Sequence, residues 1–419
     1  TERAKLVLSI DLPAGMECRR AFHWPLEFPE VFVHESSGFD AVIGNPPFIG
    51  GRRMRGALGD AFLNWLICRW PHASLNADFC VFFYLQAANL LRKNGGFGFI
   101  GTKTIGQGDS ARTGLKFLRE HYEVETRHAI SSFIWPGSAA VVAALVIVYK
   151  GRWNGEKLLD GRSVDFISEV LDSQGGWGEA KQLFRNVSRS FQGSVLVGLG
   201  FVLTEQEALE FLKQRAENAE VVKPFLSGED LNSDPEQKAS RWAIDFRDAS
   251  LELCEKKWPE LLTRIKELVK PQRDNTKRET HRRYWWHHGD KRPALYSCIK
   301  NREEVFVIAS VTKYVSVVRV PANQIFLNKV YVFDLPGWSS FCALQSTFHD
   351  VWVRRGSSTV GETLNYTPSD YFDTYPFLHI NGVNLEDVGM RYHELRKTIM
   401  KNRNQGLTNT YNQFHDQQD

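Results

Sequence analysis

The stretch Phe39-Asp-Ala-Val-Ile-Gly-Asn-Pro-Pro-Phe48 decides how the chain folds and what it can do. Its first six residues predict a short buried strand that ends at Gly44, and Asn45-Pro-Pro-Phe48 follows immediately. In an open parallel sheet, ligands bind beyond the carboxyl ends of the strands. The tetrapeptide therefore occupies the position where a substrate would bind.

The chemistry of this tetrapeptide suits an exocyclic amine such as adenine N6. Pro46 and Pro47 fix the backbone and leave carbonyl acceptors with no competing N–H. The Asn45 side-chain carbonyl and the Pro46 carbonyl can accept the two N–H bonds of the amine, which would localise its lone pair. Phe48 offers a flat face for the ring. The stretch predicts methyl transfer to an amine by positioning and preorganised dipoles, without a metal.

A paired base reaches such a pocket only by leaving the helix stack, so a second aromatic wall is expected. Phe133 and Trp135 lie in Ser131-Ser-Phe-Ile-Trp-Pro-Gly-Ser138, between two predicted strands. We select Trp135 as the second stacking side chain, with a buried loop anchor as the alternative role.

The first 150 residues read as alternating strands and helices, which predicts parallel pairing with crossover helices and a closing antiparallel hairpin. The expected strands are 39–44, 97–100, 124–130 and 141–149, and the expected helices are 78–93 and about 110–122. A glycine-rich linker at 151–161 precedes an α+β region with strands near 195–203, 305–310, 314–320 and 325–334. Its helices are expected near 205–218, 250–270 and 338–350, with a helical tail from about 384.

Composition limits the class of protein. A chain of 419 residues is long enough for two or three domains, and charged residues make up 24% of it, which is typical of a globular protein. The longest apolar run, 139–149, is well short of the roughly 20 residues that a bilayer needs, so no membrane partner is expected. The six cysteines form no CxxC pair and no zinc spacing, so no metal site is predicted.

The net charge of the chain is only +3, but the segment 264–292 is strongly basic. It contains ten Lys and Arg and four Asp and Glu. Aromatic and histidine side chains are interleaved with these charges at 284–288. Basic groups contact phosphates, and aromatic groups can stack on bases, so we predict a double-stranded DNA interface here. The predicted contacts, with basic residues near the catalytic loop added, are Arg52, Arg53, Lys103, Arg273, Lys277, Arg278, Arg282, Arg283, Trp285 and Trp286.

Together these residues resemble a known family. Asn45-Pro-Pro-Phe48 after Phe39-Asp-Ala-Val-Ile-Gly44 resembles motif IV of the N6-adenine DNA methyltransferases, and Phe22-His-Trp-Pro-Leu-Glu-Phe-Pro-Glu-Val-Phe32 looks like the segment before it in single-chain type IIG and IIL restriction-modification enzymes. Adenine methylases of DISARM-type phage-defence islands look similar. Leu90-Leu-Arg-Lys-Asn-Gly-Gly96 resembles their motif VI, and Trp135-Pro-Gly-Ser-Ala-Ala-Val resembles their motif VIII. Pro224-Phe-Leu-Ser-Gly-Glu-Asp-Leu231 and later stretches resemble their target recognition domain.

The resemblance implies a partial Rossmann-like class I methyltransferase sheet at 1–155, a DNA target recognition domain at 156–380 and a helical tail at 381–419. It implies S-adenosyl-L-methionine as cofactor, with Pro47, Phe83 and Asp40 as contacts. It also implies a bacterial cytoplasmic protein of a restriction-modification or phage-defence system, acting on a flipped-out adenine.

The family's glycine-rich motif I, which holds the cofactor, has no counterpart before Asn45. We therefore expect an upstream polypeptide or a partner chain to complete the sheet beside strand 39–44. Two alternatives stay open. The chain is a DNA-recognition fragment without its own cofactor site, or it methylates protein glutamine or RNA, since those enzymes also use an Asn-Pro-Pro-aromatic loop.

Overall fold

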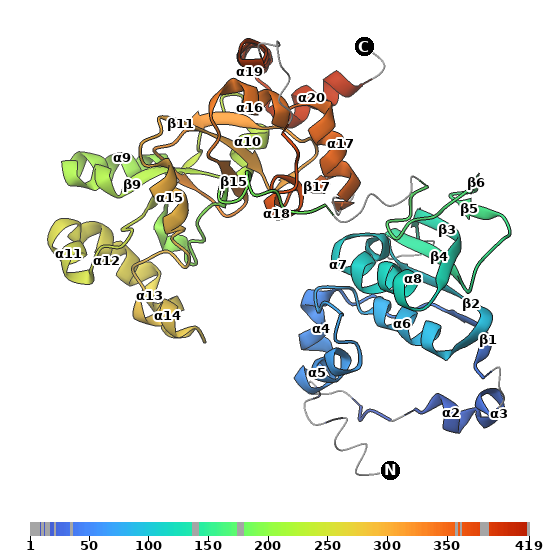
Figure 1. The fold of residues 1–419 in the computed structure, drawn as a ribbon. Coiled ribbons are helices and arrows are strands. Elements are labelled where there is room, and N and C mark those ends of the chain that lie inside the picture. Colours follow the sequence, from blue (N-terminus) through green and yellow to red (C-terminus); the bar gives the residue numbers. More distant parts are fainter. Residues whose placement is uncertain are drawn as a thin grey trace. The chain divides into compact units, whose positions relative to one another are not determined.

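A computed structural model describes residues 9, 12, 17–20, 22–33, 37–135, 142–173, 180–356, 359–360, 363–377 and 385–416. The chain divides into two compact units, Thr1–Glu179 and Ala180–Asp419 (Figure 1). Each unit has its own hydrophobic core.

Unit 1 is built on one mixed sheet with the strand order β1-β2-β4-β3-β5-β6. The strands β1 and β2 are parallel, and β4 runs antiparallel to its neighbours β2 and β3. The predicted closing hairpin is therefore present, and its second strand lies between β2 and β3. The strands are β1 (Phe39–Gly44), β2 (Leu91–Thr102), β3 (Val124–Ile134), β4 (Val142–Lys150), β5 (Lys157–Leu159) and β6 (Arg162–Val164).

One predicted boundary in unit 1 is wrong. The helix expected over 78–93 ends at Leu90, and β2 begins at Leu91. The segment Asn94-Gly95-Gly96, which follows the expected helix end at 93, lies inside β2, where the register with β1 shifts between Phe39 and Ala41. Gly95 is needed there because a Cβ would lie 2.9 Å from the Asp40 carbonyl oxygen.

Helices of unit 1 cover the sheet, and α6, α7 and α8 lie together against it (Figure 1). The central one, α6, is apolar on nearly every side and buries eight of its residues. The helices are α2 (Trp24–Glu27), α3 (Pro29–Phe32), α4 (Gly51–Leu58), α5 (Asp60–Arg69), α6 (Cys80–Leu90), α7 (Gly108–Ala111) and α8 (Phe117–His121), with a π-helical turn at Arg112–Lys116.

The strand β1 stands at one edge of this sheet, with β2 as its neighbour. It was predicted to be buried, but Ile43 is 88% exposed and Ala41 is exposed as well. An apolar edge strand is a template for further pairing.

Unit 2 contains three small sheets, with the orders β14-β9-β10-β8, β13-β11-β15-β7 and β12-β17-β16. The strands are β7 (Ser190–Gln192), β8 (Val202–Leu203), β9 (Val222–Leu226), β10 (Arg241–Ile244), β11 (Glu304–Ala309), β12 (Val311–Thr312), β13 (Val318–Pro321), β14 (Ile325–Phe326), β15 (Val330–Phe333), β16 (Thr359–Val360) and β17 (Thr363–Asn365). Most of the strand predicted at 195–203 is instead a turn with a 3-10 helix at Leu199–Phe201.

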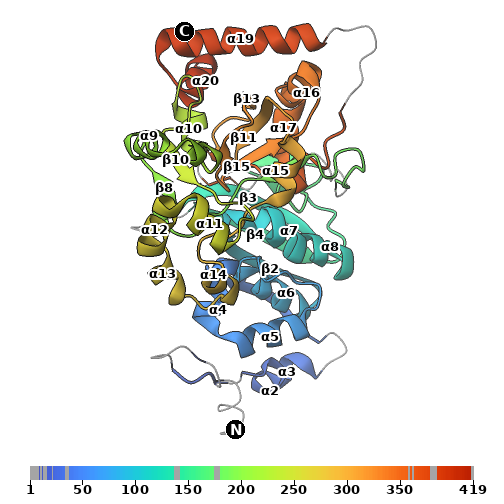
Figure 2. The same ribbon diagram turned by 90° about the vertical axis from the view of Figure 1, so that its left-hand side faces the viewer.

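The main helices of unit 2 are α9 (Glu205–Gln214), α10 (Gly228–Ser233), α11 (Leu251–Lys257), α12 (Pro259–Leu268), α13 (Lys270–Asp274), α14 (Glu279–Arg283), α15 (Pro293–Ile299), α16 (Gly337–Leu344), α17 (Thr347–Gly356), α18 (Pro368–Tyr371), α19 (Leu385–Arg403) and α20 (Leu407–His415). Figure 2 shows α19, the predicted tail helix, beside α16 and α20. The tail therefore packs into unit 2.

Candidate functional site

The loop that follows β1 exposes Asn45 and Pro47 and is anchored by its other apolar side chains. Asn45 and Pro47 are exposed, whereas Pro46 is buried and Phe48 packs on the core of unit 1. The loop closes through a hydrogen bond from the Phe79 N–H to the Ile49 carbonyl, 2.9 Å long. The Asn45 amide is therefore accessible at the carboxyl end of β1, on a loop fixed at both ends.

Gly51 holds this loop against the segment that precedes α6. A Cβ at position 51 would lie 2.5 Å from the Asn76 carbonyl carbon and oxygen and from the Leu75 carbonyl oxygen. Two backbones approach so closely only if one residue has no side chain. Sequence reasoning could not single out Gly51 among the glycines of the chain, because the close approach becomes visible only in the structure.

Asp78 ties three segments together beneath the loop. Its side chain is 6% exposed and accepts hydrogen bonds from the Cys80 N–H at 3.1 Å and from the Thr102 hydroxyl at 3.4 Å. Its own N–H donates to the Ser110 hydroxyl oxygen at 3.0 Å. Asp78, which directly precedes the loop anchor Phe79, thereby connects that anchor to the end of β2 and the start of α7. It is a positioning residue that sequence reasoning missed.

An aromatic cavity of about 460 Å³ adjoins the same anchor. Phe83, a predicted cofactor contact, is 38% exposed and meets Phe79 edge-on, with ring centroids 5.3 Å apart. None of the cavity's lining residues is acidic, and Pro47 is not among them. The lining residues are Phe22, His23, Trp24, Pro25, Phe62, Trp65, Leu66, Arg69, Trp70, Phe79, Phe82, Phe83, Gln86, Asn89 and Leu90.

The structure argues against Asp40 as a cofactor contact. Asp40 lies near the amino end of β1, roughly 16 Å along the strand from Asn45 at about 3.3 Å per residue. Its carboxylate is paired with the Arg92 guanidinium at 2.5 Å. It therefore belongs to the opposite end of the sheet from the candidate site.

The other predicted residues of unit 1 lie near the carboxyl ends of its strands. Trp135 is half-buried directly after β3, and residues 136–141 of its loop lie outside the described residues. Lys103 follows β2 and is half-buried. Arg52 and Arg53 are exposed on α4, a few residues after Phe48.

In unit 2, the predicted DNA contacts separate into two groups. Trp285 and Trp286 are 8% and 9% exposed and belong to a hydrophobic core, where the Trp286 indole N–H donates to the Ala249 carbonyl. Arg273 is 1% exposed. Burial removes these three side chains from the set of DNA contacts, because a phosphate or base cannot reach them.

Arg273 instead acts as an internal clamp. Its guanidinium donates five hydrogen bonds of 2.7–3.2 Å to the carbonyls of Leu196, Val197, Tyr284 and His287. Desolvation lowers the pKa of Arg273 to about 10, which leaves it charged at neutral pH. The sequence signal was misleading because a buried arginine looks the same as an exposed one within a basic run.

The remaining predicted basic residues are exposed. Lys277 and Arg278 precede α14, and Arg282 and Arg283 end it. The Arg282 guanidinium bonds the Thr276 carbonyl, and that of Arg283 lies 5.5 Å from the Tyr284 ring centre. These four residues form what we call the α14 basic patch.

His287 and His288 are structural. The ring of His287 hydrogen-bonds to the Ala249 carbonyl and that of His288 to the Ile244 carbonyl, each through Nε2 at 2.8 Å. Burial lowers the pKa of both, so neither carries the positive charge that would attract DNA.

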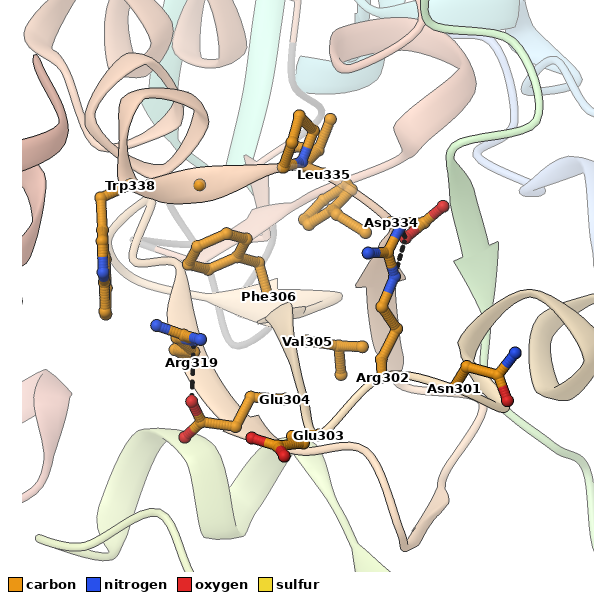
Figure 3. A pocket seen from close by; sticks show the side chains of 13 residues that line it. Asn301, Arg302, Glu303, Glu304, Val305, Phe306, Arg319, Asp334, Leu335 and Trp338 are labelled. Atoms are coloured by element: carbon orange, nitrogen blue, oxygen red, sulfur yellow. Dashed lines mark hydrogen bonds and ion pairs between the residues drawn. The ribbon is translucent and has the colours of Figure 1, made fainter.

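A second cavity of about 370 Å³ lies in unit 2 (Figure 3). The Arg302 and Arg319 guanidinium groups on its wall are paired with Asp334 at 2.8 Å and with Glu304 at 2.9 Å. Arg319 also lies 4.6 Å from the Trp338 ring centre. Because both arginines are neutralised by carboxylates, this cavity does not have the character of a phosphate site.

Within the described residues, no group of three His, Cys, Asp or Glu side chains is arranged to hold a metal ion. In the same part of the chain, no helix has the length and apolarity that crossing a membrane requires.

Comparison with known proteins finds a match in each unit. Residues 14–133 match the model of the Eco57I restriction-modification methylase family, and residues 179–379 match that of the MmeI target recognition domain. The chain thus resembles a restriction-modification methylase in its first unit and a target recognition domain in its second. In this order of parts it is similar to single-chain restriction-modification enzymes.

Among the solved structures to which the chain is similar is the type IIL restriction-modification enzyme MmeI in complex with DNA. It matches with a TM-score of 0.70 at 19% identity, over 88% of this chain and 50% of that chain, which establishes a shared fold. The type IIG restriction endonuclease BpuSI (TM-score 0.30, 12% identity, 85% and 49% covered) and the DrdV–DNA complex (0.44, 8%, 86% and 44%) match too weakly to bear on the fold. The chain spans about half the length of these structures, and no curated protein sequence matches it.

Proposed function

We propose that the chain is the catalytic and DNA-recognition part of an S-adenosylmethionine-dependent DNA adenine-N6 methyltransferase in a bacterial, cytoplasmic restriction-modification or phage-defence system. The observation that carries this proposal is the exposed Asn45 amide at the carboxyl end of β1, on a loop anchored by Pro46, Phe48 and Ile49. The two family matches supply the context of modification and DNA recognition.

In this mechanism the loop binds the amino group of an adenine that has left the duplex. The Asn45 side-chain oxygen and the Pro46 carbonyl accept its two N–H bonds, which directs the nitrogen lone pair toward the methyl donor. Phe48 and Trp135 flank the base. The loop anchors and the Asp78 hydrogen bonds hold the acceptors in place, so little reorganisation is needed during the reaction.

The aromatic cavity fits part of the implied cofactor. Phe83 and Phe79 provide walls against which an adenine ring can stack. S-adenosylmethionine supplies an electrophilic methyl group when bound. Among the described lining residues none is a carboxylate that could accept hydrogen bonds from ribose hydroxyls or from the methionine amino group.

Carboxylates that bind the cofactor would therefore come from a strand that pairs with the free edge of β1. The exposed apolar edge of β1 is suited to pairing with another strand, and we propose that an upstream segment or a partner chain pairs there and completes both the sheet and the cofactor site.

The test is methyl transfer from labelled S-adenosylmethionine to duplex DNA, RNA and protein, measured with the 419-residue chain alone and joined to the segment proposed to pair with β1. We expect label in duplex DNA, as N6-methyladenine, from the joined form. Transfer to RNA or protein in preference to DNA would favour the glutamine or RNA methyltransferase alternative. If both forms bind DNA and neither transfers the methyl group, the remaining hypothesis is that the chain is a DNA-recognition fragment without its own cofactor site.

A further inference from the structure

Four exposed apolar side chains of unit 2 lie on three neighbouring segments of the chain. Val197, Leu199, Leu268 and Tyr284 are 38%, 83%, 45% and 42% exposed. Single exposed apolar residues are common on protein surfaces and need no explanation, whereas contiguous ones mark interaction sites.

The three segments that carry these residues meet at the turn 197–200. A Cβ on Gly200 would lie 2.6 Å from the Leu268 Cβ, and one on Gly289 would lie 2.5 Å from a Val197 methyl. The Arg273 guanidinium bonds both the Val197 and the Tyr284 carbonyl. The turn therefore lies against the end of α12 on one side and the residues after α14 on the other.

The turn is rigid and its backbone is strained. Val197 has φ 54°, a left-handed conformation that a β-branched residue rarely adopts, and Gly198 follows with φ 136°. The segment leading into the turn pairs with 289–290, through Gly289 N–H to Leu196 and Asp290 N–H to Val195, at 3.0 and 2.9 Å. The buried Arg273 clamp fixes the same backbone. A buried charge and a strained valine both cost folding free energy. Together they hold Leu199, which projects into solvent, in place.

Positive charge lies beside this apolar group. Arg283 directly precedes Tyr284, and the other members of the α14 basic patch are Lys277, Arg278 and Arg282. Apolar side chains with basic ones nearby suit duplex DNA, where leucines and aromatics enter between base pairs while Lys and Arg contact the phosphates.

We propose that Leu199, supported by Val197, Leu268 and Tyr284, is a wedge that enters a base step of the bound duplex while the α14 basic patch holds the adjoining phosphates. This inference rests on the proposed function, in which unit 2 binds duplex DNA. It assigns a role to the strained turn that the methyl-transfer chemistry does not use.

The test compares the 419-residue chain with its Leu199→Ala and Leu199→Met variants. The matched control is Leu395→Ala, which truncates a 62% exposed leucine on α19. The probe is fluorescent duplex DNA enriched by binding from a random-sequence pool. Affinity is measured across a salt series, and 2-aminopurine at successive positions reports unstacking.

We expect Leu199→Ala to weaken binding about tenfold, with an unchanged slope of log affinity against log salt, because leucine neutralises no phosphate. The 2-aminopurine signal of the wild-type complex should be lost in Leu199→Ala and kept in Leu199→Met and Leu395→Ala. Wild-type affinity and signal in Leu199→Ala would overturn the wedge while leaving DNA binding intact. Altered self-association with unchanged DNA affinity would assign the surface to a protein contact and also overturn it. An absence of salt-dependent DNA binding by the wild-type chain would overturn the wedge and the proposed function together.

Discussion

At the scale of single residues, the candidate site depends on Asn45 and also on residues that hold its loop in place, among them a glycine whose lack of a side chain allows close packing. Asn45 can be placed from sequence because its type and position after a strand are both informative. Gly51 and Asp78 cannot, since their roles arise from contacts with segments over twenty residues away. The sequence thus predicts the polar residue of the candidate site, Asn45, but not the residues Gly51 and Asp78 that hold its loop.

Gly51→Ala is expected to displace the loop, because the added Cβ would collide with the backbone at Asn76. We expect a loss of about 1–3 kcal/mol in the free energy of unfolding of unit 1, measured by urea titration, together with a lower methyl-transfer rate. Gly50→Ala is the matched control, since nothing lies within 4 Å of a Cβ there. Equal stability of the two variants would show that the close approach at Gly51 does not hold the loop.

At the scale of elements, the sequence predicts strands and helices well where one period dominates. The strand at 39–44 is confirmed, and so is the helix near 205–218, although it ends at Gln214. Prediction fails where tertiary contacts decide. Residues 91–96 look like a helix end but extend β2 by pairing with β1 and β4, and Trp285 and Trp286 lie in a basic segment yet pack into the core. Charge and aromatic content alone cannot tell an interface from a core beneath it.

The α14 basic patch gives a prediction at this scale. The double change Arg282→Glu and Arg283→Glu should weaken duplex binding about tenfold or more and flatten its salt dependence, because fewer phosphates are neutralised. The measurement is fluorescence anisotropy with labelled duplex over a salt series.

The control for that experiment carries the same change in charge elsewhere in unit 2, on exposed residues of α9 and α19: Lys213→Glu with Arg391→Glu. If both double variants lose affinity equally, the effect belongs to net charge, and the assignment of the patch is wrong.

At the scale of the whole molecule, the two candidate sites lie in two units with separate cores, the Asn45 loop in unit 1 and the α14 basic patch in unit 2. The division also predicts how the chain responds to acid. Burial lowers the pKa of His349 from 6.5 to about 4, and burial with nearby basic residues does the same for His393. Both histidines lie in unit 2.

A histidine whose pKa is depressed on folding binds its proton more readily in the unfolded chain. Stability is therefore complete above pH 6.5 and is lost as the pH falls toward 4, by up to about 3 kcal/mol for each histidine. The measurement is the free energy of unfolding of unit 2 between pH 7 and 4.5. His349→Gln should reduce the slope against pH, and an unchanged slope would show that His349 is not responsible.

The most direct test of the acceptor role of Asn45 is a single-turnover assay of Asn45→Ala, in the chain joined to the segment proposed to pair with β1, with duplex affinity measured on the same preparation. We expect the formation of N6-methyladenine to slow by about a hundredfold or more while DNA affinity is unchanged, because Asn45 acts on the reacting nitrogen and not on the phosphates. Methylation by Asn45→Ala at the wild-type rate would contradict this role.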